Sequence, residues 1–132
     1  MESESFKKWL TVRSLLNHIF MATSTILERT QNIVCADDFL SSPNGMEKLD
    51  AVCMQLIAIG EAVNKIHKIT EGELFQQEPD IPWNAIRGVR NFIAHDYFDV
   101  DAEEIFHIID CNLVPLRDAV QRLQQFIIIN NP

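Results

Sequence analysis

A short stretch past the middle of the chain brings together a permanent cation, a proton-transfer group and a hydroxyl. Within Trp83 to Val100, four residues separate Arg90 from His95, and one residue separates His95 from Tyr97. An arginine guanidinium is shaped to bind phosphate, and histidine gains or loses a proton near neutral pH. A tyrosine hydroxyl can act as a nucleophile or accept a modifying group. This combination indicates a site that handles a phosphate.

The spacing of these residues suits a helix. At roughly 100° per residue, Arg87, Asn91 and His95 step along one stripe. Arg90 lies beside that stripe, and Tyr97 returns to the azimuth of Arg90 if the helix continues. The side-chain tips could then converge. Spacing alone leaves a second interpretation open, in which the arginines are solvated, His95 caps a helix end and Tyr97 packs in the core.

The charge of the chain restricts how it could bind nucleic acid. A net charge of −8 and a pI near 4.8 oppose broad, non-specific binding, which needs clustered lysine and arginine. A local site remains possible if the basic residues near the motif converge into a positive pocket. These candidate phosphate contacts are Lys65, Lys68, Arg87 and Arg90.

Composition predicts one domain over residues 1–132, because 132 residues with 47% hydrophobic content suffice for one core and not for two ordinary ones. We find neither a secretory signal nor an apolar run long enough to cross a bilayer, so we expect a soluble cytoplasmic protein with no membrane contact.

Three widely spaced cysteines favour reduced core thiols. His107 and Cys111 lie four residues apart, but two ligands do not make a site, so we expect no metal.

Apolar residues recur at three- and four-residue steps from Phe6 to Leu27 and again from Met46 to Ile69. The two runs predict long helices, separated by a polar break at residues 41–45. Gly60 interrupts the second run at a cost of up to about 1 kcal/mol relative to alanine, which suggests that another helix comes close there.

Two further helices follow. Pro82 suits the first turn of a helix that continues to Ile93 and carries the motif. Asp101 and Glu104 resemble a capping box that opens a final helix, which Pro115 should bend. Four principal helices with few strand signals predict an all-α, up-and-down four-helix bundle with a short additional helix.

Three segments between Leu56 and about Asp101 resemble the HepT-like branch of the HEPN superfamily, whose signature is R-x4-H-x-Y. The first block is residues 56–62, and the second is residues 80–83 followed by 86–91. The signature itself is Arg90, His95 and Tyr97. The order of the blocks is much more specific than an arginine and a histidine alone, and it implies a HEPN-like fold.

The resemblance implies a metal-independent endoribonuclease toxin that uses no cofactor and cleaves RNA by attack of a ribose 2′-hydroxyl on the adjacent phosphate. His95 would be general base or acid, Arg90 would hold the phosphate, and Asn91 would orient one of them. Glu61 is either an outward charge or a partner for a motif residue. The resemblance also implies a paired site at the interface of a homodimer, and the chemical reason is that one histidine does not conveniently serve as both acid and base in one step. The apolar run at residues 126–129 could seal that interface or lie in the core.

The expected partner is a minimal nucleotidyltransferase antitoxin that uses ATP and magnesium to attach AMP to Tyr97. The added negative charge would then repel the RNA phosphate. The alternative is a catalytically inactive helical adaptor that docks such a nucleotidyltransferase, an interpretation that the acidic charge favours.

Overall fold

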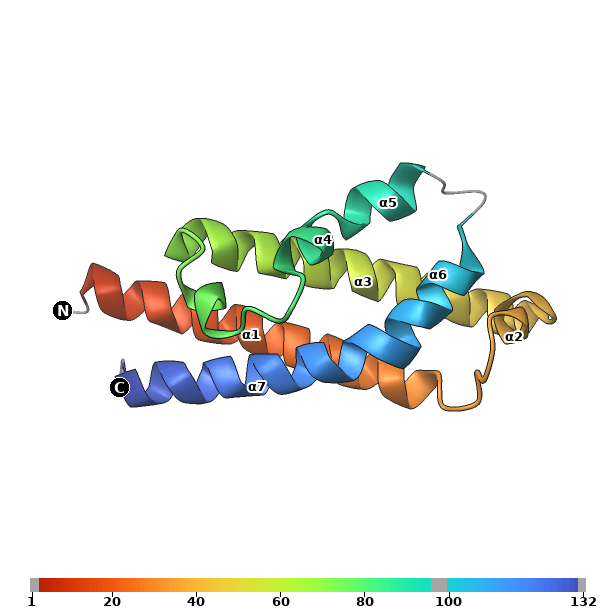
Figure 1. Ribbon diagram of the computed structural model, residues 1–132, viewed down its shortest axis with the longest axis horizontal. Coiled ribbons are helices and arrows are strands. Elements are labelled where there is room, and N and C mark those ends of the chain that lie inside the picture. The colour runs from red at the N-terminus through yellow and green to blue at the C-terminus, as the bar shows by residue number, and fades with distance from the viewer. Residues whose placement is uncertain (1–2, 96–99, 131–132) are drawn as a thin grey trace.

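The computed structural model describes residues 3–95 and 100–130, and for Ala94 and His95 the backbone only. Every regular element in these ranges is helical (Figure 1), which confirms the predicted all-α, HEPN-like bundle. The long helices are α1 (Glu4–Arg29), α3 (Pro43–Thr70) and α7 (Leu113–Asn130). The short elements are α2 (Asp37–Leu40), a 3₁₀ turn η1 (Leu74–Gln77), α4 (Trp83–Arg87), α5 (Val89–His95), α6 (Ala102–His107) and a π-helical turn η3 (Ile108–Asn112).

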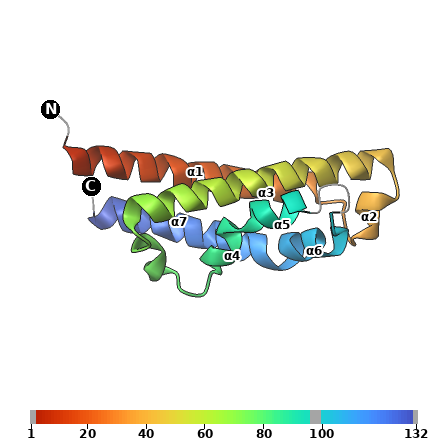
Figure 2. The same cartoon turned by 90° about the horizontal axis from the view of Figure 1, so that it is seen from above.

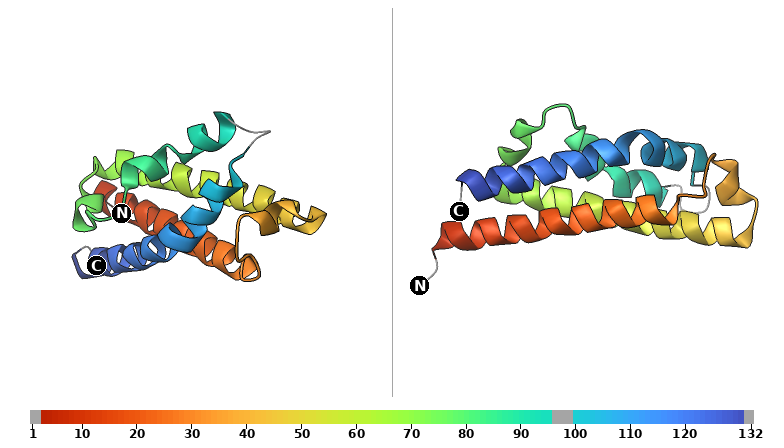
Figure 3. Two further views of the ribbon diagram at one scale, coloured as in Figure 1. Left: turned by 45° about the vertical axis from the view of Figure 1, so that its right-hand side comes forward. Right: turned by 90° about the horizontal axis from the view of Figure 1, so that it is seen from below.

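The chain makes four passes in alternating directions. α1 goes out, α3 returns beside it, α4 and α5 go out again, and α6 with α7 comes back, so the start of α1 and the end of α7 lie at the same end (Figures 1 and 2). The third arm is short and rests chiefly on α3. Figure 3 shows α5 lying over α3, on the side of the bundle away from α7.

α3 begins three residues before the predicted Met46, because its start is determined by capping rather than by apolar periodicity. The Ser42 hydroxyl accepts a hydrogen bond from the Gly45 amide at 2.9 Å, and Pro43 occupies the first turn. Proline needs no hydrogen-bond partner for its nitrogen there, so it fits this position without loss. The predicted polar break is therefore wrong for residues 43–45, which are helical.

Gly60 is where the third arm comes nearest to α3. A Cβ added at Gly60 would lie 2.8 Å from the Ile86 carbonyl oxygen and 2.9 Å from Val89 Cγ1. Both distances are shorter than a real Cβ contact, so only glycine lets the α4–α5 junction sit on α3 in this way. The close approach inferred from the sequence is confirmed. Ile93, buried on α5, adds a second anchor to the core.

The continuous helix predicted from Pro82 to Ile93 is wrong. The chain forms two helices that meet at Gly88, whose backbone has φ −90° and ψ 0° and whose amide contacts the carbonyls of Asn84 and Ala85 at 3.2 Å. This tightened turn ends α4 and redirects the chain into α5. Pro82 precedes the first turn of α4 as its N-cap, rather than lying within that turn.

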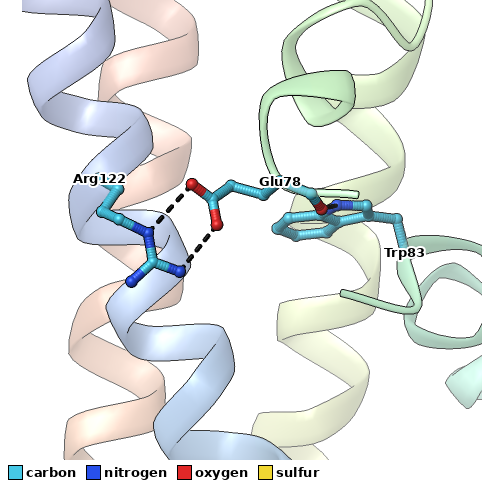
Figure 4. Close-up of polar contacts among 3 residues, drawn as sticks. All are labelled: Glu78, Trp83 and Arg122. Carbon is cyan, nitrogen blue, oxygen red and sulfur yellow. Dashed lines mark hydrogen bonds and ion pairs between the residues drawn. The ribbon is translucent and has the colours of Figure 1, made fainter. Parts of the chain in front are cut away.

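α4 is fixed at its start by contacts around Trp83 (Figure 4). The Trp83 indole N–H donates to the Glu78 carbonyl at 2.9 Å. The Trp83 ring also stacks on Phe75, with ring centroids 3.9 Å apart. The Glu78 carboxylate in turn accepts two hydrogen bonds from Arg122 of α7, at 2.7 and 3.0 Å. These hydrogen bonds raise the pKa of Arg122 above its ordinary value. The loop before α4 is thus tied to α7 by a bidentate pair.

The last arm begins as predicted and bends earlier than predicted. Asp101 Oδ1 accepts hydrogen bonds from the amides of Glu103 at 3.0 Å and Glu104 at 3.3 Å, which confirms the cap. The helix then widens into η3, and Pro115 follows in the first turn of α7. A proline ring crowds the carbonyl four residues earlier, here that of Cys111 within η3, so the π-helical turn accommodates it.

Only one cysteine is the core thiol that the sequence suggested. Cys53 is buried, and burial, with a smaller effect of Asp50, raises the pKa of its thiol to about 11. Cys35 and Cys111 are exposed.

The apolar run at residues 126–129 is divided between core and surface, since Ile127 is fully buried whereas Ile128 and Ile129 are exposed. None of the helices within residues 3–95 and 100–130 is long and apolar enough to cross a membrane.

Candidate active site

A polar stripe on α3 underlies the motif helices. Glu61, Asn64, Lys65 and Lys68 are spaced by three, four and seven residues from the first, so they share one face of the helix. Glu61 contacts α5 and Asn64 contacts α4 through side-chain hydrogen bonds. The stripe is therefore the surface on which the motif arginines are placed.

Arg90 of α5 is held by a carboxylate. Its Nη1 donates to Glu61 Oε1 at 2.8 Å, and the two side chains are 66% and 43% exposed. An ion pair this exposed typically contributes only about 0–1 kcal/mol to stability. Glu61 thus orients Arg90, and an anion that binds the guanidinium more strongly can displace the Glu61 carboxylate. Glu61 does contact an arginine of the motif, whereas its part in catalysis stays a prediction.

Arg87 of α4 is held by two neutral amides. Its Nε donates to Asn64 Oδ1 at 3.1 Å, and its Nη1 donates to Asn84 Oδ1 at 3.3 Å. Arg87 as a whole residue is half-buried. A continuous helix would align Arg87, Asn91 and His95 on one stripe. The break at Gly88 instead leaves Arg87 on α4 and the other two residues on α5.

The remaining motif residues are placed to different extents. Asn91 is exposed on α5, next to Arg90. His95 is the last residue of α5, one helical turn beyond Asn91, with only its backbone described. Tyr97 lies outside the described residues. The roles of all three therefore stay predictions.

The basic residues lie along one face. Lys65 and Lys68 are exposed on the α3 stripe, which also contacts Arg87 and Arg90. Within the described residues, the one carboxylate seen bonded to a cation of this group is Glu61. Exposed lysines on the stripe beside the two arginines are suited to contact a phosphate.

Sequence reasoning missed Asn64 and Asn84. Both bind Arg87 through their amide oxygens, and neither belongs to the R-x4-H-x-Y pattern. The available signal was periodicity, since Asn64 follows Glu61 by three residues on α3 and Asn84 precedes Arg87 by three on α4.

Two grooves flank the site. One groove, of about 510 Å³, lies between α1 and α3, and the residues that line it include Glu61, Lys65 and His18. The other, of about 520 Å³, is lined mainly by apolar side chains and lies between α3, α4 and the last arm. His107 and Cys111 line this second groove. In the part of the chain that is described, no three His, Cys, Asp or Glu side chains gather to hold a metal.

Comparison with known families gives a decisive match. The model described as ribonuclease HepT-like matches residues 19–123, a span that includes the α3 stripe, both arginines and the whole signature. The chain belongs to the HepT-like ribonuclease family. The resemblance recognised in three segments of the sequence is thereby confirmed over most of the chain.

Curated relatives of this HepT-like chain match most of its length. A protein of Caldanaerobacter subterraneus subsp. tengcongensis, named as a candidate RNase, is 30% identical over 87% of this chain and 96% of its own. A probable ribonuclease HepT of Thermococcus cleftensis is 27% identical over 86% of this chain and 96% of its own. No solved structure gives a significant match.

Proposed function

We propose that this HepT-like protein is a metal-independent endoribonuclease toxin acting on RNA in the cytoplasm. The observation that carries the proposal is the pair of arginines, Arg87 and Arg90, set side by side on the α3 stripe of a chain whose net charge is −8. Cations gathered on the α3 stripe and the two helices on it favour a local phosphate substrate. Relatives named as candidate or probable ribonucleases support the same substrate class.

The chemistry needs only groups of the protein and the RNA. The ribose 2′-oxygen attacks the adjacent phosphorus, the bond from phosphorus to the 5′-oxygen breaks, and a 2′,3′-cyclic phosphate and a 5′-hydroxyl result. A base removes the 2′-hydroxyl proton and an acid protonates the leaving 5′-oxygen; His95 fills one of these roles. Arg90 binds the phosphate and offsets the charge that develops on it. Asn91 orients either His95 or Arg90.

A single His95 does not conveniently supply both proton transfers, so the proposed site is paired across a homodimer. Each subunit would contribute one Arg90 and one His95 to a shared cleft. Ile128 and Ile129 are 52% and 75% exposed at the end of α7, away from α5 (Figure 1), so covering them would need a contact other than this shared cleft. Light scattering that finds only monomer at micromolar concentration would contradict the paired site.

The direct test is cleavage of a single-stranded RNA by the purified protein in the presence of EDTA. We expect fragments that end in 2′,3′-cyclic phosphate, because the attacking group belongs to the RNA itself. An otherwise identical oligonucleotide with 2′-deoxyribose at the cleaved position should resist at that position. Cleavage of the deoxy-substituted site, or loss of activity on chelation, would remove the proposed mechanism.

Regulation is proposed to act on Tyr97. A partner nucleotidyltransferase, with ATP and magnesium, would attach AMP to its hydroxyl, placing an anionic phosphodiester two residues from His95. Incubation with that partner should add one AMP mass per modified chain and suppress cleavage. Tyr97→Phe keeps the ring and removes the acceptor oxygen, so it should block the mass increase. A Tyr97→Phe protein modified to the wild-type extent would place the acceptor elsewhere.

A second candidate function is a catalytically inactive adaptor that docks the nucleotidyltransferase. The net charge of −8 favours it, and so does the carboxylate of Glu61 on the motif arginine. Expression without the partner separates the two, since growth inhibition is expected of the toxin and not of the adaptor.

A further inference from the structure

The charges of Arg87 and Arg90 are neutralised to different degrees. Arg90 faces the carboxylate of Glu61, which carries a full negative charge, whereas Arg87 faces the amides of Asn64 and Asn84, which carry none. An amide oxygen fixes the direction of a guanidinium and leaves its net charge intact. A carboxylate oxygen fixes the direction and cancels the charge.

We propose that Arg87, held by Asn64 and Asn84, forms a separate phosphate subsite that the free protein offers to RNA, while Glu61 occupies the phosphate position at Arg90 until substrate displaces it. Asn64 and Asn84 are positioning residues in this scheme. The inference rests on the proposed ribonuclease function and names how its substrate is bound. Of the two arginines, Arg87 is open to substrate and Arg90 is covered by Glu61.

The open subsite follows from the geometry of Arg87. The amides engage Nε and Nη1, which leaves Nη2 free of side-chain hydrogen bonds within the described residues. Half-burial restricts the side chain, so little of its freedom is lost when a phosphate binds. Lys68 is exposed four residues beyond Asn64 on the same face of α3 and extends the positive charge along the stripe.

The covered subsite follows from the position of Glu61. Its Oε1 lies 2.8 Å from Arg90 Nη1, which is where a phosphate oxygen would accept the same hydrogen bond. The pair is well exposed, so an incoming phosphate already anchored at Arg87 competes with Glu61 at high local concentration. RNA would therefore reach Arg87 first and Arg90 second.

Two isosteric substitutions with opposite expected effects test this order. Asn64→Asp places a carboxylate on Arg87, and Glu61→Gln removes the carboxylate from Arg90. The probe is a fluorescein-labelled single-stranded RNA with all 2′-hydroxyls methylated, so that binding is measured by anisotropy without cleavage. We expect Asn64→Asp to weaken binding about tenfold and to reduce the slope of log K against log salt by about 0.7. Glu61→Gln should tighten binding several-fold and increase the slope.

The matched control is Gln121→Glu, which adds the same charge on an exposed position of α7, away from α5 (Figure 1). It should change binding by less than about twofold. Asn84→Asp repeats the test of Arg87 at an exposed position, in case Asn64→Asp loosens the contact between α3 and α4. Thermal unfolding of each variant checks the fold.

Each outcome is decisive. If folded Asn64→Asp and Asn84→Asp bind like Gln121→Glu, Arg87 is not a phosphate subsite. If Glu61→Gln leaves binding unchanged or weakens it, Glu61 does not cover Arg90. Either result, obtained with a wild-type protein that cleaves unmodified RNA, overturns this inference alone; a wild type that neither cleaves nor binds RNA overturns the proposed function.

Discussion

His95→Ala should lower the rate of RNA cleavage by about 10²- to 10⁴-fold, the usual contribution of a positioned general acid or base. Arg90→Ala should cause a loss of about 10²- to 10³-fold, typical of removing one group that stabilises developing charge. Both residues lie on α5, which has two buried or half-buried anchors, Val89 and Ile93, that neither substitution touches. The loss should therefore appear in cleavage and in growth inhibition while the melting temperature stays nearly constant.

His18→Ala is the matched control for His95→Ala. His18 is an exposed histidine on α1 that lines the groove beside Glu61 and lies outside the signature. It should retain most of the wild-type rate. Cleavage by His95→Ala at the wild-type rate would remove this histidine from the mechanism, and an equal loss in His18→Ala would move the proton-transfer group to α1.

Gly60→Ala should destabilise the fold by about 1–3 kcal/mol, the usual cost of overpacking, even though alanine is the better helix former by about 1 kcal/mol. The added Cβ would meet the backbone oxygen of Ile86 at 2.8 Å, and a backbone atom cannot turn away as a long side chain can. α4 and α5 must then shift from α3. We expect a fall in the denaturant midpoint together with a loss of RNA cleavage, because Arg87 and Arg90 move away from Asn64 and Glu61.

Gly88→Ala is the control with the same added methyl group. There the nearest atoms to a new Cβ are the Asn84 and Ala85 carbonyl oxygens at 3.6 and 3.7 Å, which are ordinary contacts, and φ is −90°. Its stability should stay within about 1 kcal/mol of wild type or rise slightly, since alanine reduces the entropy of the unfolded chain. Equal destabilisation by the two substitutions would show that the contact at Gly60 does not hold the third arm.

Features that depend on near neighbours in the chain were predictable. The apolar periodicity of α1 and α3 determines which faces are buried, and the Asp101 side chain caps α6 through amides two and three residues away. Gly60 also gave a correct indication, because a glycine inside an otherwise strong helix costs stability unless something approaches it closely. The family signature needed only residue types and spacing.

Features that depend on packing between distant segments were not predictable. Periodicity continued through residues 82–93 as if one helix were present, yet the chain breaks at Gly88, where the α4–α5 junction contacts α3 at Gly60.

The sequence by itself therefore determined the helical class and the buried faces of the long helices, since capping and amphipathic spacing act within a few residues. It also contains the signature residues Arg90, His95 and Tyr97, which are recognised from residue type and spacing alone. The tertiary structure alone decided which groups hold the arginines. Arg87 meets Asn64 across 23 residues of chain and Arg90 meets Glu61 across 29. Those pairings exist because Gly60 lets two short helices lie directly on α3, and no local preference specifies a contact of that range.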